Sequence, residues 1–161
     1  MRIRLVSLFL LIALVATVAT AAAAPLDTRN FRAHLNGDGA GVETLGQGQA
    51  IFQFSKDGDE LYYKLILANI EDVTMAHIHV APQGQNGPIA LWLYPDAPPP
   101  QLIEGRFDGV LAEGAATSGD LVGPLAGGSL DDLTMAIDEG RAYVNVHTTQ
   151  HPGGEIRGTI H

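Results

Sequence analysis

The chain has 161 residues, a formal net charge of −9 and no cysteine. This length suits one domain, and the acidic balance argues against nucleic-acid binding, because phosphate backbones require a basic face. Without cysteine the chain has no disulfide, no thiolate nucleophile, and no iron–sulfur or blue-copper site.

Residues 1–24 have the order of a secretory signal peptide. Arg2 and Arg4 precede an apolar run over 5–18, and small residues suited to cleavage follow. The run is shorter than the roughly 20 residues that a membrane span needs. We therefore expect a secreted or periplasmic domain over 25–161 with no stable membrane anchor after cleavage; the alternative is an uncleaved anchor.

Most of the remaining chain alternates apolar and polar residues, which is typical of half-buried strands. The alternation predicts strands near 31–35, 49–54, 61–67, 75–80, 89–93, 107–111, 142–147 and 156–160, with a weaker one at 117–122. The turn Lys56-Asp57-Gly58-Asp59 predicts a hairpin between the second and third of these strands.

One segment breaks this pattern. Ser129 is a suitable helix N-cap, Asp131 and Asp132 follow in the first turn, and Gly140 supplies a stop, so a short helix is expected over about 129–139. About eight short strands and one helix predict an all-β fold, an antiparallel Greek-key sandwich or barrel.

His77 and His79 carry the clearest chemical signal. Alternate residues of a strand point to one face, roughly 6.5–7 Å apart, so two imidazoles at this spacing can converge on a metal ion. Apolar Ala76, Ile78 and Val80 interleave with them. We therefore expect Ile78 in the core and the two histidines facing away from it. The alternative is an ordinary pair of solvent-facing histidines.

His147 could complete such a site. It ends a strand whose polar face also holds Asn145, and His151 follows after a short loop. Three or four imidazoles without cysteine suit copper(II) or zinc. The spacing alone does not place His147 near the H-x-H pair, and we expect His34 and His161 to be exposed bystanders.

Two further observations concern the other polar residues. Glu155 and Arg157 share a strand face, which predicts an ion pair at the surface or pinning a loop. The sequence contains no P-loop, no G-x-S-x-G elbow and no H-E-x-x-H helix. We therefore assign no catalytic residue.

Four motifs occur in order along the chain: Ala76-His77-Ile78-His79, Gly84-Gln85-Asn86-Gly87-Pro88, residues 140–148 and Gly154-Glu155-Ile156-Arg157-Gly158. Together they resemble the CHRD domain, a module first described in chordin and found alone in many exported microbial proteins. The resemblance covers roughly residues 29–161 and implies an extracellular binding protein of unknown ligand. A weaker resemblance is to copper/zinc superoxide dismutase, whose copper is held by an H-x-H strand pair and later histidines. The chain departs from that enzyme in lacking a cysteine pair and an evident histidine-rich zinc loop.

The leading hypothesis is an exported CHRD binding module whose only suggested cofactor is a single copper or zinc ion at His77, His79 and His147. Its partner would be that ion or an extracellular or periplasmic protein. One alternative is a copper-dependent redox enzyme of the superoxide dismutase type. Another is a purely structural interaction domain in which the histidines are incidental.

Overall fold

The computed structural model describes residues 29–161, and the expected signal peptide at 1–24 lies outside them. The described chain forms seven strands, two short α-helices and two 3-10 turns. The strands are β1 (Asn30–Asn36), β2 (Gln47–Phe54), β3 (Leu61–Val80), β4 (Ile89–Tyr94), β5 (Ile103–Ala116), β6 (Ala142–Thr148) and β7 (Ile156–Thr159). The helices are α1 (Gly37–Ala40) and α2 (Leu130–Asp138), and the turns are η1 (Ser118–Asp120) and η2 (Gly123–Leu125). The predicted all-β class is confirmed.

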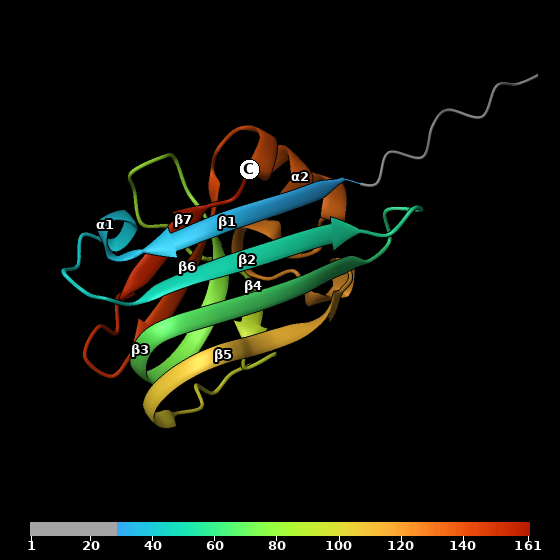
Figure 1. The fold of residues 1–161 in the computed structure, drawn as a ribbon. Helices are drawn as coiled ribbons and strands as arrows, with labels where there is room; N and C mark the ends of the chain where they lie inside the picture. Colours follow the sequence, from blue (N-terminus) through green and yellow to red (C-terminus); the bar gives the residue numbers. More distant parts are fainter. Residues whose placement is uncertain (1–28) are drawn as a thin grey trace, which may run out of the picture.

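The strands pair antiparallel throughout and form two layers. The layer in front in Figure 1 contains β1, β2, the first half of β3, and β5; the layer behind contains β7, β6, the second half of β3, and β4. Because β1 also pairs with β7, the sheet closes into a barrel, with β4 and β5 as additional strands on β3.

Strand β3 links the two layers and corrects the prediction of two separate strands at 61–67 and 75–80. It runs unbroken for 20 residues and bends at Asn69 and Asp72, whose φ angles are 56° and 52°. Asparagine and aspartate tolerate this left-handed conformation better than most residues. The bend carries the second half of β3, with the H-x-H pair, into the rear layer.

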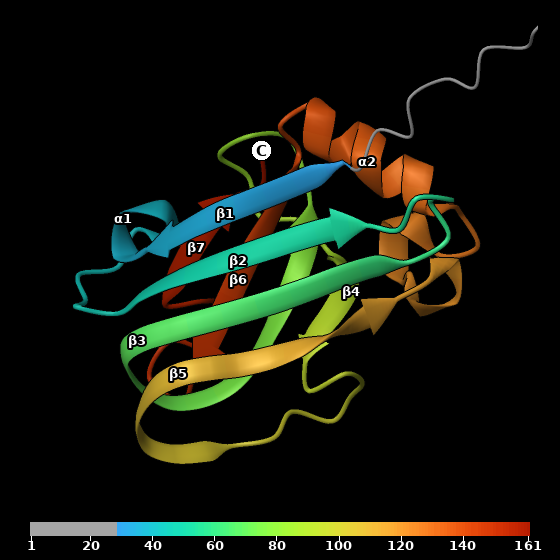
Figure 2. The same ribbon diagram turned by 45° about the vertical axis from the view of Figure 1, so that its right-hand side comes forward.

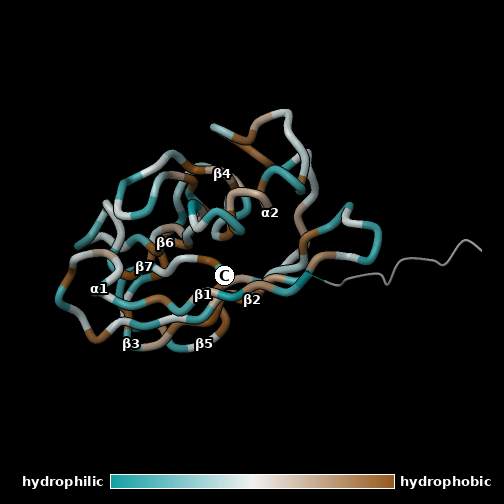
Figure 3. Tube along the Cα trace, turned by 90° about the horizontal axis from the view of Figure 1, so that it is seen from above, coloured by the Kyte–Doolittle hydropathy of each residue, from teal (hydrophilic) through white to brown (hydrophobic). Residues whose placement is uncertain are grey.

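Apolar side chains from both layers fill the barrel. The alternation along the strands is visible as alternating colours in Figure 3, and Leu35, Phe52, Leu65 and Ile78 are each at most 1% exposed. Ile78 therefore lies in the core, as predicted. Its neighbours on β3 face the opposite side of the sheet, which is the outer face of the rear layer.

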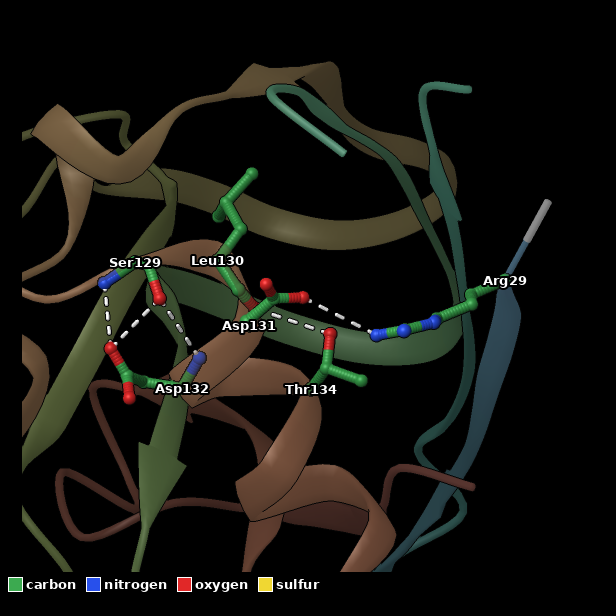
Figure 4. A network of polar contacts seen from close by, with 6 residues as sticks. All are labelled: Arg29, Ser129, Leu130, Asp131, Asp132 and Thr134. Carbon is green, nitrogen blue, oxygen red and sulfur yellow. Dashed lines mark hydrogen bonds and ion pairs between the residues drawn. The ribbon is translucent and has the colours of Figure 1, made fainter. Parts of the chain in front are cut away.

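Helix α2 lies beside the end of the barrel where β1 begins (Figure 2). Its predicted N-cap is confirmed: Asp132 accepts from the backbone N–H of Ser129 at 2.7 Å, and Ser129 Oγ accepts in return from the backbone N–H of Asp132. Arg29, just before β1, pairs with Asp131 at 3.4 Å (Figure 4). No helix within residues 29–161 is long and apolar enough to cross a membrane.

The predicted strand at 117–122 is wrong, because this segment forms the 3-10 turn η1. The Asp120 carboxylate accepts from the Thr117 backbone N–H at 2.7 Å, and Thr117 Oγ1 accepts from the backbone N–H of Gly119. Such local side-chain hydrogen bonds offer the backbone an alternative to strand pairing.

Candidate metal centre

Three histidines meet on the outer face of the rear layer. His77 and His79 are two residues apart on β3, and cross-strand pairing sets His147 of β6 opposite Met75, two positions before His77. One ligand nitrogen from each histidine lies within 4.8 Å of the other two. His77 Nδ1 and His147 Nε2 are in direct contact, 3.3 Å apart.

Two backbone carbonyls orient the rings of His79 and His147. Nδ1 of His79 lies 2.9 Å from the oxygen of Gly87, and Nδ1 of His147 lies 2.9 Å from the oxygen of Pro152. A carbonyl oxygen can only accept, so each neutral ring carries its proton on Nδ1 and has a lone pair on Nε2. This arrangement is the one that metal-binding histidines commonly use to fix their tautomer.

The histidines are buried, which rules out the alternative of an ordinary solvent-facing pair. The exposed fractions of His77, His79 and His147 are 0%, 8% and 6%. They face away from the apolar core, as predicted, but loops over 81–88 and 149–155 supply the carbonyls that contact them from outside the sheet. Alternation in sequence identifies the face on which a side chain lies and does not reveal what covers that face.

This burial keeps the imidazoles neutral. Loss of hydration lowers the pKa of His77 to about 3, with smaller contributions from His147 and His79. Burial likewise lowers the pKa of His79 to about 4 and lowers the pKa of His147, although the hydrogen bonds to Gly87 and Pro152 oppose the change. Neutral rings can ligate a metal at neutral pH.

Aromatic rings form the walls of the cluster. The ring of Trp92 packs edge-on against His77 with centroids 4.1 Å apart, and the ring of Tyr143 stacks on His79 at 5.2 Å. The Tyr143 hydroxyl accepts from the backbone N–H of Gly87 at 2.9 Å. At Gly87 a side chain would meet the Val80 carbonyl oxygen at 2.2 Å, so glycine allows the loop to lie this close to the histidines.

Arg157 and Glu155 do not pair with each other in the described structure, which corrects the predicted ion pair. Arg157 donates to Asn86 Oδ1 at 2.8 Å and lies over the ring of Tyr143 at 4.4 Å. Glu155 is buried and accepts from the hydroxyls of Thr44 and Thr148 at 2.7 and 2.8 Å. Glu155 therefore holds a loop in place, but it does so through hydrogen bonds from hydroxyl groups and not through an ion pair with Arg157.

The remaining histidines stand apart. His34 and His161 are exposed and His151 is half-buried, and none of the three joins a metal-type cluster within the described residues. His151 instead lies in the loop over 149–155, where its backbone N–H donates to Thr148 Oγ1 at 3.1 Å. Of the four imidazoles considered from sequence, the structure brings together three.

A family model for the CHRD domain matches residues 31–160, nearly the whole described chain. The chain belongs to the CHRD domain family. CHRD domains are typically extracellular, so the match indicates an extracellular type of binding module. No curated protein and no solved structure matches the chain.

Proposed function

We propose that this CHRD domain binds one copper or zinc ion through His77 Nδ1, His79 Nε2 and His147 Nε2. The observation that carries the proposal is the convergence of three neutral ring nitrogens, two of which have lone pairs fixed by backbone carbonyls. The 3.3 Å between His77 Nδ1 and His147 Nε2 also fits a shared ion, because tetrahedral ligands at about 2.0–2.1 Å lie roughly 3.3–3.4 Å apart.

The donor set supports the choice of metal. Imidazole nitrogens suit zinc and copper, whereas calcium and magnesium prefer oxygen ligands. Three protein ligands leave at least one coordination position for water, a small molecule or a partner's side chain. A binding module with such a position can recognise its ligand through the metal.

Trp92 provides the test, because it is the single tryptophan of the chain and touches His77. Copper(II) added to the metal-free protein should quench Trp92 fluorescence with saturation at one equivalent, and excess zinc should slow the quenching by competition. His79→Ala should weaken the binding, whereas His34→Ala, at an exposed position, should leave it unchanged. Equal quenching of the wild type and His79→Ala would overturn the assignment.

A second candidate is redox chemistry at a bound copper ion. Its specific support is Arg157, whose positive charge contributes to the lowered pKa of both His79 and His147 and so acts on the site. A cation beside a metal with an open position favours catalysis on a small anion. If this is correct, the copper-loaded protein consumes superoxide and the zinc-loaded protein does not. Equal rates for the two forms would exclude it.

We also propose that the domain is secreted or periplasmic. The support is the basic, apolar and small-residue order of residues 1–24, together with the extracellular character of CHRD domains. Mass spectrometry of the exported protein should find a new N-terminus near residue 25. An intact N-terminus would favour the uncleaved anchor.

A further inference from the structure

Four buried side-chain atoms make no hydrogen bond in the described structure, and all belong to the histidine cluster or its neighbours. They are His77 Nε2, His79 Nε2, Asn145 Oδ1 and Arg157 Nε. Unpaired buried polar atoms are rare because each has lost its hydrogen bonds to water without gaining a partner in the protein. His79 Nε2 is accounted for by the proposed metal ion, which leaves three atoms without a role.

These three atoms belong to one row across the sheet. His77 of β3 lies directly opposite Asn145 of β6, and Asn145 lies directly opposite Arg157 of β7. Directly opposed residues on one face have Cβ atoms roughly 4.5–5.5 Å apart, within reach of their polar ends. Asn145, in the middle of the row, is only 1% exposed.

The amide of Asn145 has a fixed orientation. Its Nδ2 donates to the Gly153 carbonyl at 3.0 Å, so Oδ1 is the free end. Gly154 packs directly on this amide, where a side chain would come within 2.1 Å of Oδ1. The fold therefore presents a buried carbonyl oxygen, with two lone pairs, between His77 and Arg157.

The tautomer of His77 explains why this oxygen receives no hydrogen bond from His77 in the metal-free protein. Nε2 of His147 carries a lone pair, so the 3.3 Å contact requires His77 to donate from Nδ1. His77 Nε2 is then an acceptor, as is Asn145 Oδ1, and two acceptors cannot bond. A metal ion on His77 Nδ1 would reverse this, because the neutral ring must then carry its proton on Nε2.

We infer that Asn145 is a positioning residue for the metal centre, and that its Oδ1 accepts a hydrogen bond from His77 Nε2 when a metal occupies His77 Nδ1. The inference rests on the proposed function. His77 loses one proton to solvent at Nδ1 and gains one at Nε2, so its charge does not change. The second lone pair of Asn145 Oδ1 can accept from Arg157 Nε, which would give all three atoms partners.

Variants at Asn145 separate this role from a structural one. Asn145→Asp keeps an acceptor toward His77 and loses the donor to Gly153, whereas Asn145→Leu loses both. Because partners of metal-binding histidines contribute roughly 10–100-fold to affinity, Asn145→Leu should weaken zinc binding by that factor. Asn145→Asp should bind zinc at least as tightly as the wild type. Equal weakening in both variants would show that Asn145 acts only through Gly153 and would overturn the inference.

Nitrogen-15 NMR of the histidine rings tests the same inference in the wild-type protein and does not depend on variants that fold. In the metal-free protein His77 should be protonated at Nδ1, and in the zinc-loaded protein at Nε2. Zinc on His77 Nε2, with the proton still on Nδ1, would overturn the inference and leave metal binding intact. If the wild type binds neither zinc nor copper, the proposed function itself fails.

Discussion

Lowering the pH should destabilise the metal-free domain through the two buried histidines of β3. Burial lowers the pKa of His77 to about 3 and that of His79 to about 4, whereas an unfolded chain holds both near 6.5. Between these values the unfolded chain binds protons that the folded domain does not bind. The free energy of unfolding therefore falls as the pH decreases from about 6.5 towards 4.

The size of the effect follows from the difference in bound protons. Each histidine contributes a slope of at most about 1.4 kcal/mol per pH unit. The slope develops only below about pH 6.5, so the two residues together should remove roughly 4 kcal/mol between about pH 7 and pH 5. That is a large share of the 5–15 kcal/mol typical of a folded domain.

Urea unfolding followed by circular dichroism, over the same pH range, measures this loss. The matched control is the double variant His77→Gln/His79→Gln, which lacks both groups and keeps every carboxylate. The wild type should lose roughly 4 kcal/mol more than the double variant, and His34→Gln should behave as the wild type. Equal pH slopes in the wild type and the double variant would refute the burial of neutral histidines.

Three further predictions concern stability. Ile78→Asp places an unpaired charge at a position that is 0% exposed and should prevent folding, whereas Ile78→Val should cost about 1 kcal/mol in urea unfolding; a well-folded Ile78→Asp would show that the facing of β3 is wrong. Glu155→Ala should lower the free energy of unfolding by roughly 1–3 kcal/mol because the hydroxyls of Thr44 and Thr148 lose their acceptor. An unchanged free energy of unfolding would show that these hydrogen bonds are exposed to solvent. The thermal midpoint should not respond to reductant, since the chain has no cysteine; a drop would reveal an unrecognised disulfide-linked partner.

Local patterns in the sequence predicted most of the individual elements. Period-two alternation located the strands, because one face of each is buried, and Ser129 with Asp132 located the start of α2. The bend at Asn69 and Asp72 was missed, because left-handed backbone at two polar residues reads as a turn between strands rather than as a curve within one. Only pairing with β2 and β6 at its two ends shows that β3 is continuous.

The candidate site could be predicted in part. Alternation placed His77 and His79 on one face, but the approach of His147 to His77, 70 residues away in sequence, depends on the pairing of β3 with β6. The burial of these residues depends on loops, which have no periodicity to read. Asn145 was noted as a neighbour of His147, yet its role required the cross-strand register and the unpaired state of its oxygen.

Metal analysis of the protein purified from its native source tests the central claim most directly. We predict one copper or zinc ion per chain in the wild type, and loss of that ion in a His77→Ala/His79→Ala variant that stays folded. A His34→Ala variant should retain the ion. A folded wild type that carries no metal and takes up neither copper nor zinc, or a double variant with the same metal content as the wild type, would contradict the claim.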